Sequence, residues 1–181
     1  MDSLQLVSVI IPTFKTNNSL IRAVSSVLNQ TYTNIEVIVV DDNDPDTVYR
    51  SRAKSIMERF LDDKRVKYLC HERNKNGSAA RNTGVKHSRG EFICFLDDDD
   101  LYMRDKVSKQ VAYLLMNPQH QAVYCWRYHN GDIIINTKIG DLSKEILSLS
   151  FTPYTSSLMI RRECYEALGG FDENFRRHQD F

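Results

Sequence analysis

Four consecutive aspartates, Asp97 to Asp100, are the residues of this sequence best suited to chemistry. Their carboxylates repel one another, so the cluster needs water, cations or helix ends to neutralise it. Carboxylate oxygens are hard ligands, and without a neighbouring His or Cys they favour Mg²⁺ or Mn²⁺ over Zn²⁺. A metal held by one or two carboxylates completes its shell with water and substrate phosphate. The run therefore indicates a divalent-metal site for a phosphate-bearing ligand, with solvated loop acids or a helix cap as the alternative.

A second acidic pair, Asp41-Asp42, follows the apolar run 37–40. One interpretation is an Asx turn or a helix cap. The other is ligand contact, because a carboxylate at a strand end can accept hydrogen bonds from a ribose or a base edge. Neither G-x-G-x-x-G nor G-x-x-x-x-G-K-[ST] occurs in the chain, so phosphate binding by a glycine-rich loop is unsupported. A metal would have to hold a diphosphate instead.

The apolar pattern predicts the elements that position these acids. Short apolar runs predict strands, and apolar residues with a helical period predict helices. The predicted strands are 6–11, ended by Pro12, then 37–40, 66–70 and 91–96, and the helices are 19–28, 47–61, 78–87 and 103–115. This alternation predicts an α/β fold with a mostly parallel sheet flanked by helices on both faces. Both acidic groups should converge at the carboxyl ends of its strands.

After Gln121 the pattern becomes more antiparallel. Segments 122–128 and 133–137 flank Asn130-Gly131-Asp132, which predicts a hairpin, and 156–160 predicts a further strand. We expect one domain over 1–181, with 1–100 as its ligand-binding half and 101–181 as a smaller second half.

Composition excludes several classes of protein. The 181 residues include 24 Lys plus Arg and 24 Asp plus Glu, so no global field marks the chain for nucleic acid. No apolar run approaches the roughly 20 residues of a membrane-spanning helix, and the start lacks the basic residues of a secretory signal. The four cysteines form no C-x-x-C pair, which favours reduced thiols and a cytoplasmic location.

Six segments in order along the chain share a pattern with a known family. They read VSVIIPTF (7–14), SVLNQTY (26–32), VVDD (39–42), NGSAARN (76–82), FLDDDD (95–100), and GGFDE (169–173) followed by HQD (178–180). Together they resemble the family 2 glycosyltransferases, nucleotide-sugar-dependent enzymes with the Rossmann-like GT-A fold. The resemblance spans nearly the whole chain and makes 101–181 the acceptor-side half.

The resemblance implies a nucleotide site made of five matched residues. Asp42 would contact the nucleobase, and Pro12, Thr13 and Phe14 would line the same pocket. Arg81 would lie near the nucleotide.

It also implies the metal ligands and the catalytic base. Asp97 and Asp99 match the two acids of the family's D-x-D motif, so Asp99 is the first choice for the metal and Asp97 for metal or ribose. Asp98 occupies the variable middle position and is grouped with the nucleotide-binding residues. Asp180 falls where inverting members keep a general base.

The activity that the resemblance implies is a single displacement with inversion. An acceptor hydroxyl would attack the donor sugar while a nucleoside diphosphate, UDP by family frequency, leaves with Mn²⁺ or Mg²⁺. The acceptor would be a carbohydrate or a lipid-linked sugar in surface polysaccharide or glycoconjugate synthesis. The expected place is the cytoplasm, peripheral at the inner face of the membrane, and a homodimer is left open.

Three departures from the family pattern qualify this expectation. Lys15 stands where Asn is common, Gln179 replaces an acid, and the chain ends at Phe181, one residue after Asp180. Family members generally continue with acceptor-binding segments, so we expect a truncated catalytic portion. The segment 176–178 would bind phosphate or an anionic acceptor, or would be a solvated charged stretch.

Three alternatives remain at this point. A nucleotidyltransferase also uses carboxylate-held Mg²⁺, but the first strand lacks the glycine-rich basic signature. A phospho-receiver domain groups acids at strand ends, but it places the acidic pair after its first strand. A nucleotide-sugar-binding fragment without activity is the third.

Overall fold

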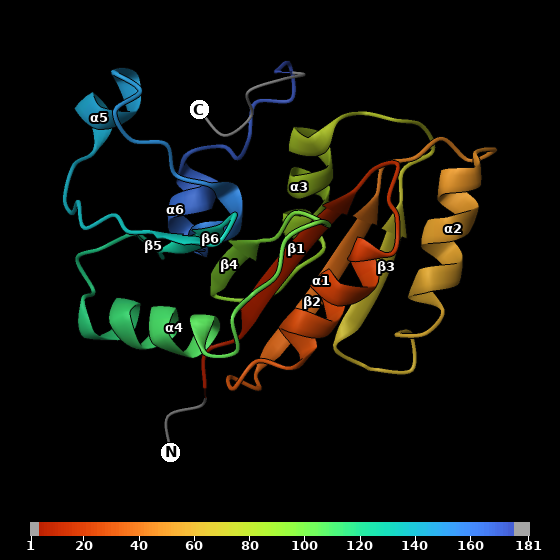
Figure 1. Ribbon diagram of the computed structural model, residues 1–181, viewed down its shortest axis with the longest axis horizontal. Coiled ribbons are helices and arrows are strands. Elements are labelled where there is room, and N and C mark those ends of the chain that lie inside the picture. The colour runs from red at the N-terminus through yellow and green to blue at the C-terminus, as the bar shows by residue number, and fades with distance from the viewer. Residues whose placement is uncertain (1–3, 176–181) are drawn as a thin grey trace.

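The computed structural model describes residues 4–175, and its centre is a six-stranded sheet in the order β3-β2-β1-β4-β8-β5 (Figure 1). Strands β1 to β4 are parallel, and β8 runs antiparallel to both β4 and β5. The mostly parallel sheet expected from the alternating pattern is therefore confirmed. The strands are β1 (Val7–Thr13), β2 (Ile35–Asp41), β3 (Val66–Cys70), β4 (Phe92–Phe95), β5 (Ala122–Tyr124) and β8 (Leu158–Arg161).

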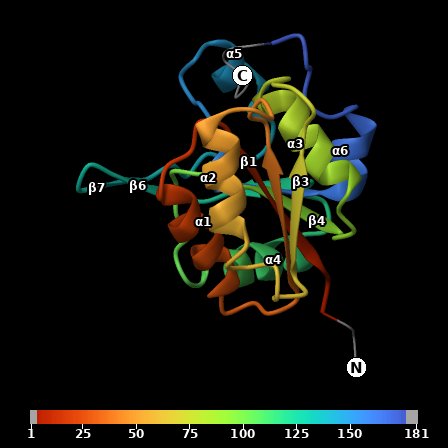
Figure 2. The same ribbon diagram turned by 90° about the vertical axis from the view of Figure 1, so that its right-hand side faces the viewer.

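Helices cover both faces of this sheet, as Figure 2 shows edge-on. The helices that cover it are α1 (Ser19–Leu28), α2 (Val48–Met57), α3 (Gly77–Lys86), α4 (Lys106–Met116) and α6 (Arg162–Ala167). The short helix α5 (Ser143–Leu147) lies away from the sheet, and a 3₁₀ turn is formed by Thr155–Ser157. Because successive strand residues point to opposite faces, Val9 and Ile11 pack in the core under α1 and α4, whereas Ile10 packs under α3 and α6. The two cores hold α3 and α1 on opposite sides of β1.

Proline 12 does not end the first strand, which is a correction to the sequence prediction. It pairs in register with Val40 of β2, whereas the register between β1 and β4 stops at Ile10. A proline is tolerated where its missing N–H would have no ladder partner. The strand therefore continues to Thr13, which places that side chain at the carboxyl edge.

The second half also differs from the prediction. Segment 122–128 splits, so that Ala122–Tyr124 joins the main sheet as β5, and only β6 (Arg127–His129) and β7 (Asp132–Ile134) form the hairpin. Asn130 and Gly131 at its turn both have positive φ, as predicted for such a turn. The helix predicted over 103–115 also starts later than expected, because α4 begins at Lys106 and Met103 lies outside it.

Helix α3 lies unusually close to β1, and Gly84 makes this possible. A Cβ at Gly84 would come within 2.2 Å of Ile10 Cγ2. A methyl group there would force the helix away from the sheet, because well-packed cores do not absorb such overlap. The close approach fixes the position of α3, which carries Arg81.

Glu36 forms a buried polar centre between β1, β3 and the start of β4. Its carboxylate accepts hydrogen bonds from the Ser8 hydroxyl at 2.8 Å, the Arg89 N–H at 2.5 Å and Lys67 Nζ at 3.2 Å. Burial alone would raise the pKa of Glu36, but these hydrogen bonds and the Lys67 charge hold it below its ordinary value of 4.5.

We predict that Glu36→Gln makes the free energy of unfolding less dependent on pH below pH 7. A depressed folded-state pKa contributes stability that is complete above the unfolded value and is lost as pH falls through the folded value. Urea unfolding at pH 7 and pH 3.5 should show a smaller loss in the variant than in the parent. Glu58→Gln, at an exposed position, is the control and should follow the parent. An equal acid-induced loss in parent and Glu36→Gln would contradict the assignment.

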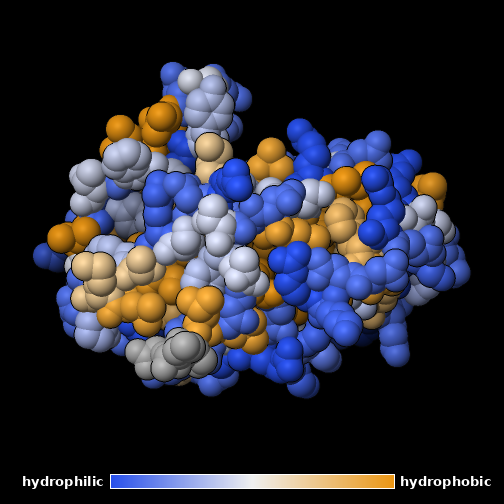
Figure 3. Space-filling view, turned by 90° about the horizontal axis from the view of Figure 1, so that it is seen from below, coloured by the Kyte–Doolittle hydropathy of each residue, from blue (hydrophilic) through white to orange (hydrophobic). Residues whose placement is uncertain are grey.

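Figure 3 shows the surface at the amino ends of the parallel strands, which mixes hydrophobic and hydrophilic groups. All the acids that the sequence analysis singled out between residues 41 and 100 lie at or just after the carboxyl ends of strands, at the opposite end of the sheet. Within residues 4–175, no helix is long and apolar enough to cross a membrane. All four cysteines are free thiols, as expected.

Candidate functional site

The carboxyl ends of β1, β2 and β4 meet at one edge of the sheet, as the parallel topology requires. The Thr13 hydroxyl at the end of β1 donates to Asp98 Oδ2 at 2.5 Å, and the Asp42 N–H donates to the Thr13 carbonyl at 2.9 Å. Three predicted site residues from three separate segments are thus directly connected.

The four aspartates after β4 have different surroundings. Asp97 and Asp98 are half-buried, whereas Asp99 and Asp100 are exposed. The Asp97 N–H donates to the Ser156 hydroxyl at 3.1 Å, and the Asp100 N–H donates to the Asp97 carbonyl at 3.0 Å. The loop is therefore held at its base, and the Asp99 carboxylate is left at the surface.

Arg81 of α3 reaches this loop. Its Nη2 lies 2.7 Å from Asp97 Oδ1, and its guanidinium lies 5.6 Å from the centre of the Phe171 ring. Arg81 is only 6% exposed. In the structure its first role is therefore to orient Asp97, because a charge-assisted pair of this length fixes the carboxylate.

The pKa of the Asp98 carboxyl lies above its ordinary value. Burial raises its pKa, hydrogen bonds from Thr13 and Thr16 oppose this, and the neighbouring charges of Asp99 and Asp97 raise it further. Like charges held this close favour a bound cation.

The residues present fit a divalent metal that is bound partly by carboxylates of the loop 97–100 and partly by oxygens of a diphosphate. Asp99 and Asp97 supply hard oxygen ligands on one loop, the kind that Mg²⁺ and Mn²⁺ accept. Within residues 4–175, no group of three or more His, Cys, Asp or Glu side chains could hold a metal by itself. The remaining ligands would have to be water and substrate oxygens.

Asp41 and Asp42, although adjacent, differ in function within the fold. Asp41 is fully buried, and its carboxylate accepts hydrogen bonds from the Asn43 N–H at 2.9 Å and the Tyr68 hydroxyl at 2.5 Å. The Arg50 Nε lies 3.0 Å from Asp41 Oδ2. The turn interpretation is therefore confirmed for Asp41, which anchors the end of β2.

We predict that Asp41→Asn lowers the free energy of unfolding by about 3 kcal/mol, because it leaves the mostly buried Arg50 guanidinium without its counter-charge. Urea unfolding followed by circular dichroism measures this. Asp63→Asn is the control, because the Asp63–Arg65 pair is about one third exposed on both sides and should cost less than about 1 kcal/mol. Equal losses in the two variants would contradict the proposed role of Asp41.

Asp42 is only 2% exposed, and its carboxylate takes four internal hydrogen bonds. Oδ1 lies 2.7 Å from His71 Nδ1 and accepts from the Lys75 N–H at 2.8 Å. Oδ2 accepts from the Asn74 amide at 2.8 Å and from the Asn76 N–H at 2.9 Å. These contacts hold the segment 74–76, which leads into α3.

Pro12 is half-buried and Phe14 is 47% exposed, so that the Phe14 ring is available at the surface beside Thr13. Lys15 follows with a positive φ of 54° and its Nζ lies 5.1 Å from the centre of the Phe14 ring. Lys15 is one of the positions where the sequence departs from the family pattern.

The segment after α6 is held against α3. Asn82 accepts the Phe171 N–H at 2.9 Å and donates to the Phe171 carbonyl at 2.8 Å, and its amide also reaches Glu173 Oε1 at 2.9 Å. The Asn76 amide donates to the Glu173 carbonyl at 2.8 Å. The chain leading toward Asp180 is thereby attached beside Arg81, but Asp180 itself lies outside the described residues.

Sequence reasoning missed three residues of this edge. His71 contacts Asp42, Ser156 holds the Asp97 N–H, and Asn82 holds Phe171. Asn82 belonged to a matched motif without a role of its own, whereas His71 and Ser156 had no pattern to mark them. Each meets a partner at least 29 residues away.

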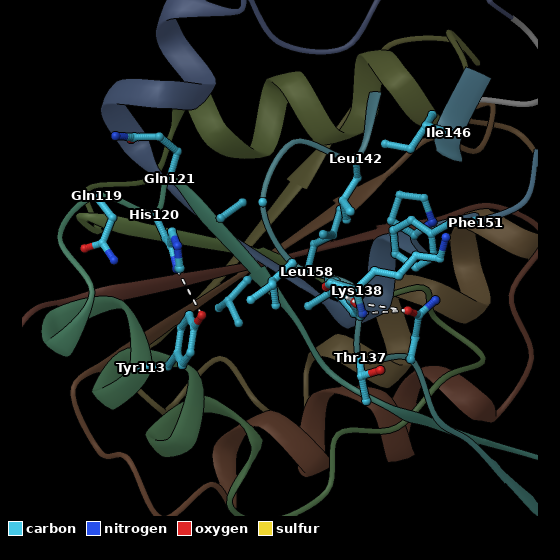
Figure 4. Close-up of a pocket in the computed structure, with 17 residues that line it drawn as sticks. Tyr113, Gln119, His120, Gln121, Thr137, Lys138, Leu142, Ile146, Phe151 and Leu158 are labelled. Carbon is cyan, nitrogen blue, oxygen red and sulfur yellow. Dashed lines mark hydrogen bonds between the residues drawn. The ribbon is translucent and has the colours of Figure 1, made fainter. Parts of the chain in front are cut away.

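A separate cavity of about 640 Å³ lies beyond β5 (Figure 4). Its wall combines α4, β5, segment 136–142 and the residues around Phe151 and Leu158, and the Tyr113 hydroxyl meets His120 Nδ1 there at 3.0 Å. None of the residues predicted as site residues lines it.

Comparison with known proteins decides the family. The model of the family described as Glycosyl transferase family 2 matches residues 8–168. The chain belongs to this family. Of the glycosyltransferase, nucleotidyltransferase and phospho-receiver alternatives, the match selects the first, and the family resemblance stated from the sequence motifs is confirmed.

Three proteins illustrate the relationship of this family 2 chain. It is 37% identical over 134 residues to Escherichia coli WfgD, which is named as a UDP-Glc:alpha-D-GlcNAc-diphosphoundecaprenol beta-1,3-glucosyltransferase. The aligned residues cover 74% of this chain and 49% of WfgD. The structure of S. aureus TarS 1–349 in complex with UDP has a TM-score of 0.78 at 21% identity, covering 97% of this chain and 52% of that one. The mannosyltransferase PcManGT from Pyrobaculum calidifontis, in complex with GDP-Man and Mn²⁺, has a TM-score of 0.71 at 22% identity, covering 96% and 49%.

The structural likenesses establish the fold of the family 2 chain, and the GT-A expectation is confirmed. The chain spans only part of the curated relatives compared with it, for example 15% of a Rickettsia bellii protein and 56% of a Rickettsia typhi protein.

Proposed function

We propose that this chain carries the donor site and the catalytic residues of a glycosyltransferase that uses a nucleotide-diphosphate sugar. The observation that carries the proposal is the direct connection of Thr13, Asp98, Asp97 and Arg81 at one sheet edge, with Asp99 exposed beside them. Membership of family 2 supports the same reaction class.

The proposed donor site divides between base and diphosphate. Asp42, with Pro12, Thr13 and Phe14, would receive the nucleobase and ribose, and the loop 97–100 would receive the diphosphate with Arg81 behind it. A base N–H can reach Asp42 only by replacing one of its four internal donors. UDP is the proposed nucleotide, because WfgD is named for UDP-Glc and the similar TarS structure contains UDP.

A Mn²⁺ or Mg²⁺ ion held by Asp99, with Asp97, would act as a Lewis acid toward the departing diphosphate. Asp97 is set for this by its contacts with Arg81 and Ser156. Asp180 would accept the proton of the attacking acceptor hydroxyl, and a single displacement of this kind inverts the anomeric centre. The acceptor is proposed to be a carbohydrate or lipid-linked sugar of a surface glycoconjugate, which the name of WfgD supports.

A donor screen tests the proposal. Thermal unfolding is followed with UDP-, GDP- and dTDP-sugars, each with and without Mn²⁺, because a ligand that binds only the native state raises its stability. We expect Mn²⁺-dependent stabilisation by one nucleotide class, UDP. Stabilisation by none of them would contradict the proposed function, and stabilisation by GDP-sugars alone would contradict the donor.

A further inference from the structure

His71 is a buried histidine between the predicted nucleobase carboxylate and helix α3. It directly follows β3 and is 6% exposed. Its Nδ1 lies 2.7 Å from Asp42 Oδ1, and its Nε2 lies 2.9 Å from the Thr83 hydroxyl oxygen. Both ring nitrogens therefore have a protein partner, and the ring has one orientation.

A single protonation pattern satisfies both contacts with a neutral ring. Nδ1–H donates to the Asp42 carboxylate, and Nε2 accepts from the Thr83 hydroxyl. The Asp42 carboxylate only accepts, so it places the proton on Nδ1, and the Thr83 hydroxyl holds Nε2 and thereby the orientation of the ring. Thr83 lies two residues after Arg81 on α3, so the same helix contacts His71 through Thr83 and the loop after β4 through Arg81.

The two oxygens of Asp42 face different environments. Oδ1 is held by buried His71 and by a backbone N–H, whereas one donor to Oδ2 is the side-chain amide of Asn74, an exposed residue. Of the four donors, the Asn74 amide is the one that can leave without moving the backbone or a buried ring. The orientation of the carboxylate would then depend on the contact that remains on Oδ1.

We propose that His71 is a positioning residue for nucleobase recognition. It holds Asp42 through Oδ1, so that Oδ2 can exchange the Asn74 amide for an N–H group on the edge of a pyrimidine base such as uracil. This inference rests on the proposed function, since it assumes that Asp42 meets the base. His71 itself makes no contact with the ligand.

The test separates base recognition from metal–diphosphate binding. Calorimetric titrations with Mn²⁺ compare UDP with inorganic pyrophosphate, which has no base, for the parent and for His71→Phe. We expect a loss of UDP affinity of about tenfold, the usual scale for one hydrogen bond to a charged group, with unchanged pyrophosphate affinity. His71→Gln retains an amide donor toward Asp42 and should recover part of the loss. His87→Phe is the matched control, because the His87 ring contacts the carbonyl oxygen of Thr83 but does not contact Asp42.

The outcomes are distinguishable. Equal UDP affinities for the parent and His71→Phe, or parallel losses for UDP and pyrophosphate, would overturn the positioning role. No Mn²⁺-dependent UDP binding by the parent would overturn the proposed donor and this inference with it, whereas the proposed function fails only if no nucleotide class binds. If circular dichroism shows that His71→Phe does not fold, Thr83→Val replaces it, and a selective loss for UDP is again the expected result and an unchanged UDP affinity the contrary one.

Discussion

Asp99→Asn should remove the metal-dependent part of nucleotide binding, lowering the affinity for UDP in the presence of Mn²⁺ about a hundredfold, which corresponds to about 2.8 kcal/mol. Asp99 is the exposed D-x-D acid, whereas Asp97 is paired with Arg81. An amide in its place keeps the shape of the side chain but loses the charge that a divalent cation requires. Calorimetric titration of UDP with and without Mn²⁺ measures the effect.

Asp100→Asn is the matched control for this prediction. Asp100 is the other exposed acid of the loop, and its N–H contact with the Asp97 carbonyl survives the substitution. It should bind UDP with Mn²⁺ within about threefold of the parent. A result in which Asp99→Asn binds as tightly as the parent, or in which both variants lose affinity equally, would contradict a specific role for Asp99.

Asp180→Asn should leave UDP binding unchanged and should lower the rate of sugar transfer about 10²–10⁴-fold, the usual contribution of a general base. Asp180 lies outside the described residues, but the segment before it is attached to α3 beside Arg81 through Asn82. Transfer from a labelled UDP-sugar is measured in the longest available form of the protein, and calorimetry measures UDP binding in the same sample.

The control for the catalytic base is Asp172→Asn. Asp172 is an exposed acid of the same segment, whose carboxylate accepts the Asn174 N–H at 2.8 Å. Its substitution should change neither binding nor transfer. Full transfer activity in Asp180→Asn would eliminate this residue as the base, and a parent protein that binds UDP but transfers nothing would favour the binding-fragment alternative.

The first half of the fold could be predicted from sequence because β1, β2 and β4 are buried on both faces along nearly their whole length. Val66–Cys70 and Ser19–Leu28 match the predicted ranges, and the helical period of the second segment is a strong signal. Pro12 was one exception, because a proline is acceptable in a strand wherever the neighbouring ladder has already ended. Another was the helix predicted over 47–61, which ends at Met57.

The second half was less predictable because its strands are short and pair over long distances. Leu158–Arg161 inserts antiparallel between β4 and β5, a placement that no local pattern specifies. The hairpin turn at Asn130-Gly131 was correct because its residues favour positive φ, but the extent of its strands was not.

The candidate site was predictable as a set of strand-end acids but not in its detail. Sequence alone could not distinguish the buried anchor Asp41 from Asp42, or the half-buried Asp98 from the exposed Asp99, because these differences arise from contacts made across the sheet. His71 was invisible for the same reason, since its partners Asp42 and Thr83 come from separate elements.

The most direct test of the metal-centred donor site is anomalous diffraction from crystals of this protein grown with UDP and Mn²⁺. We predict one manganese peak within coordination distance of the Asp99 carboxylate and of both phosphates of UDP, with the uracil beside Asp42. A diphosphate bound at this edge without metal, or a manganese ion away from the loop 97–100, would contradict the account.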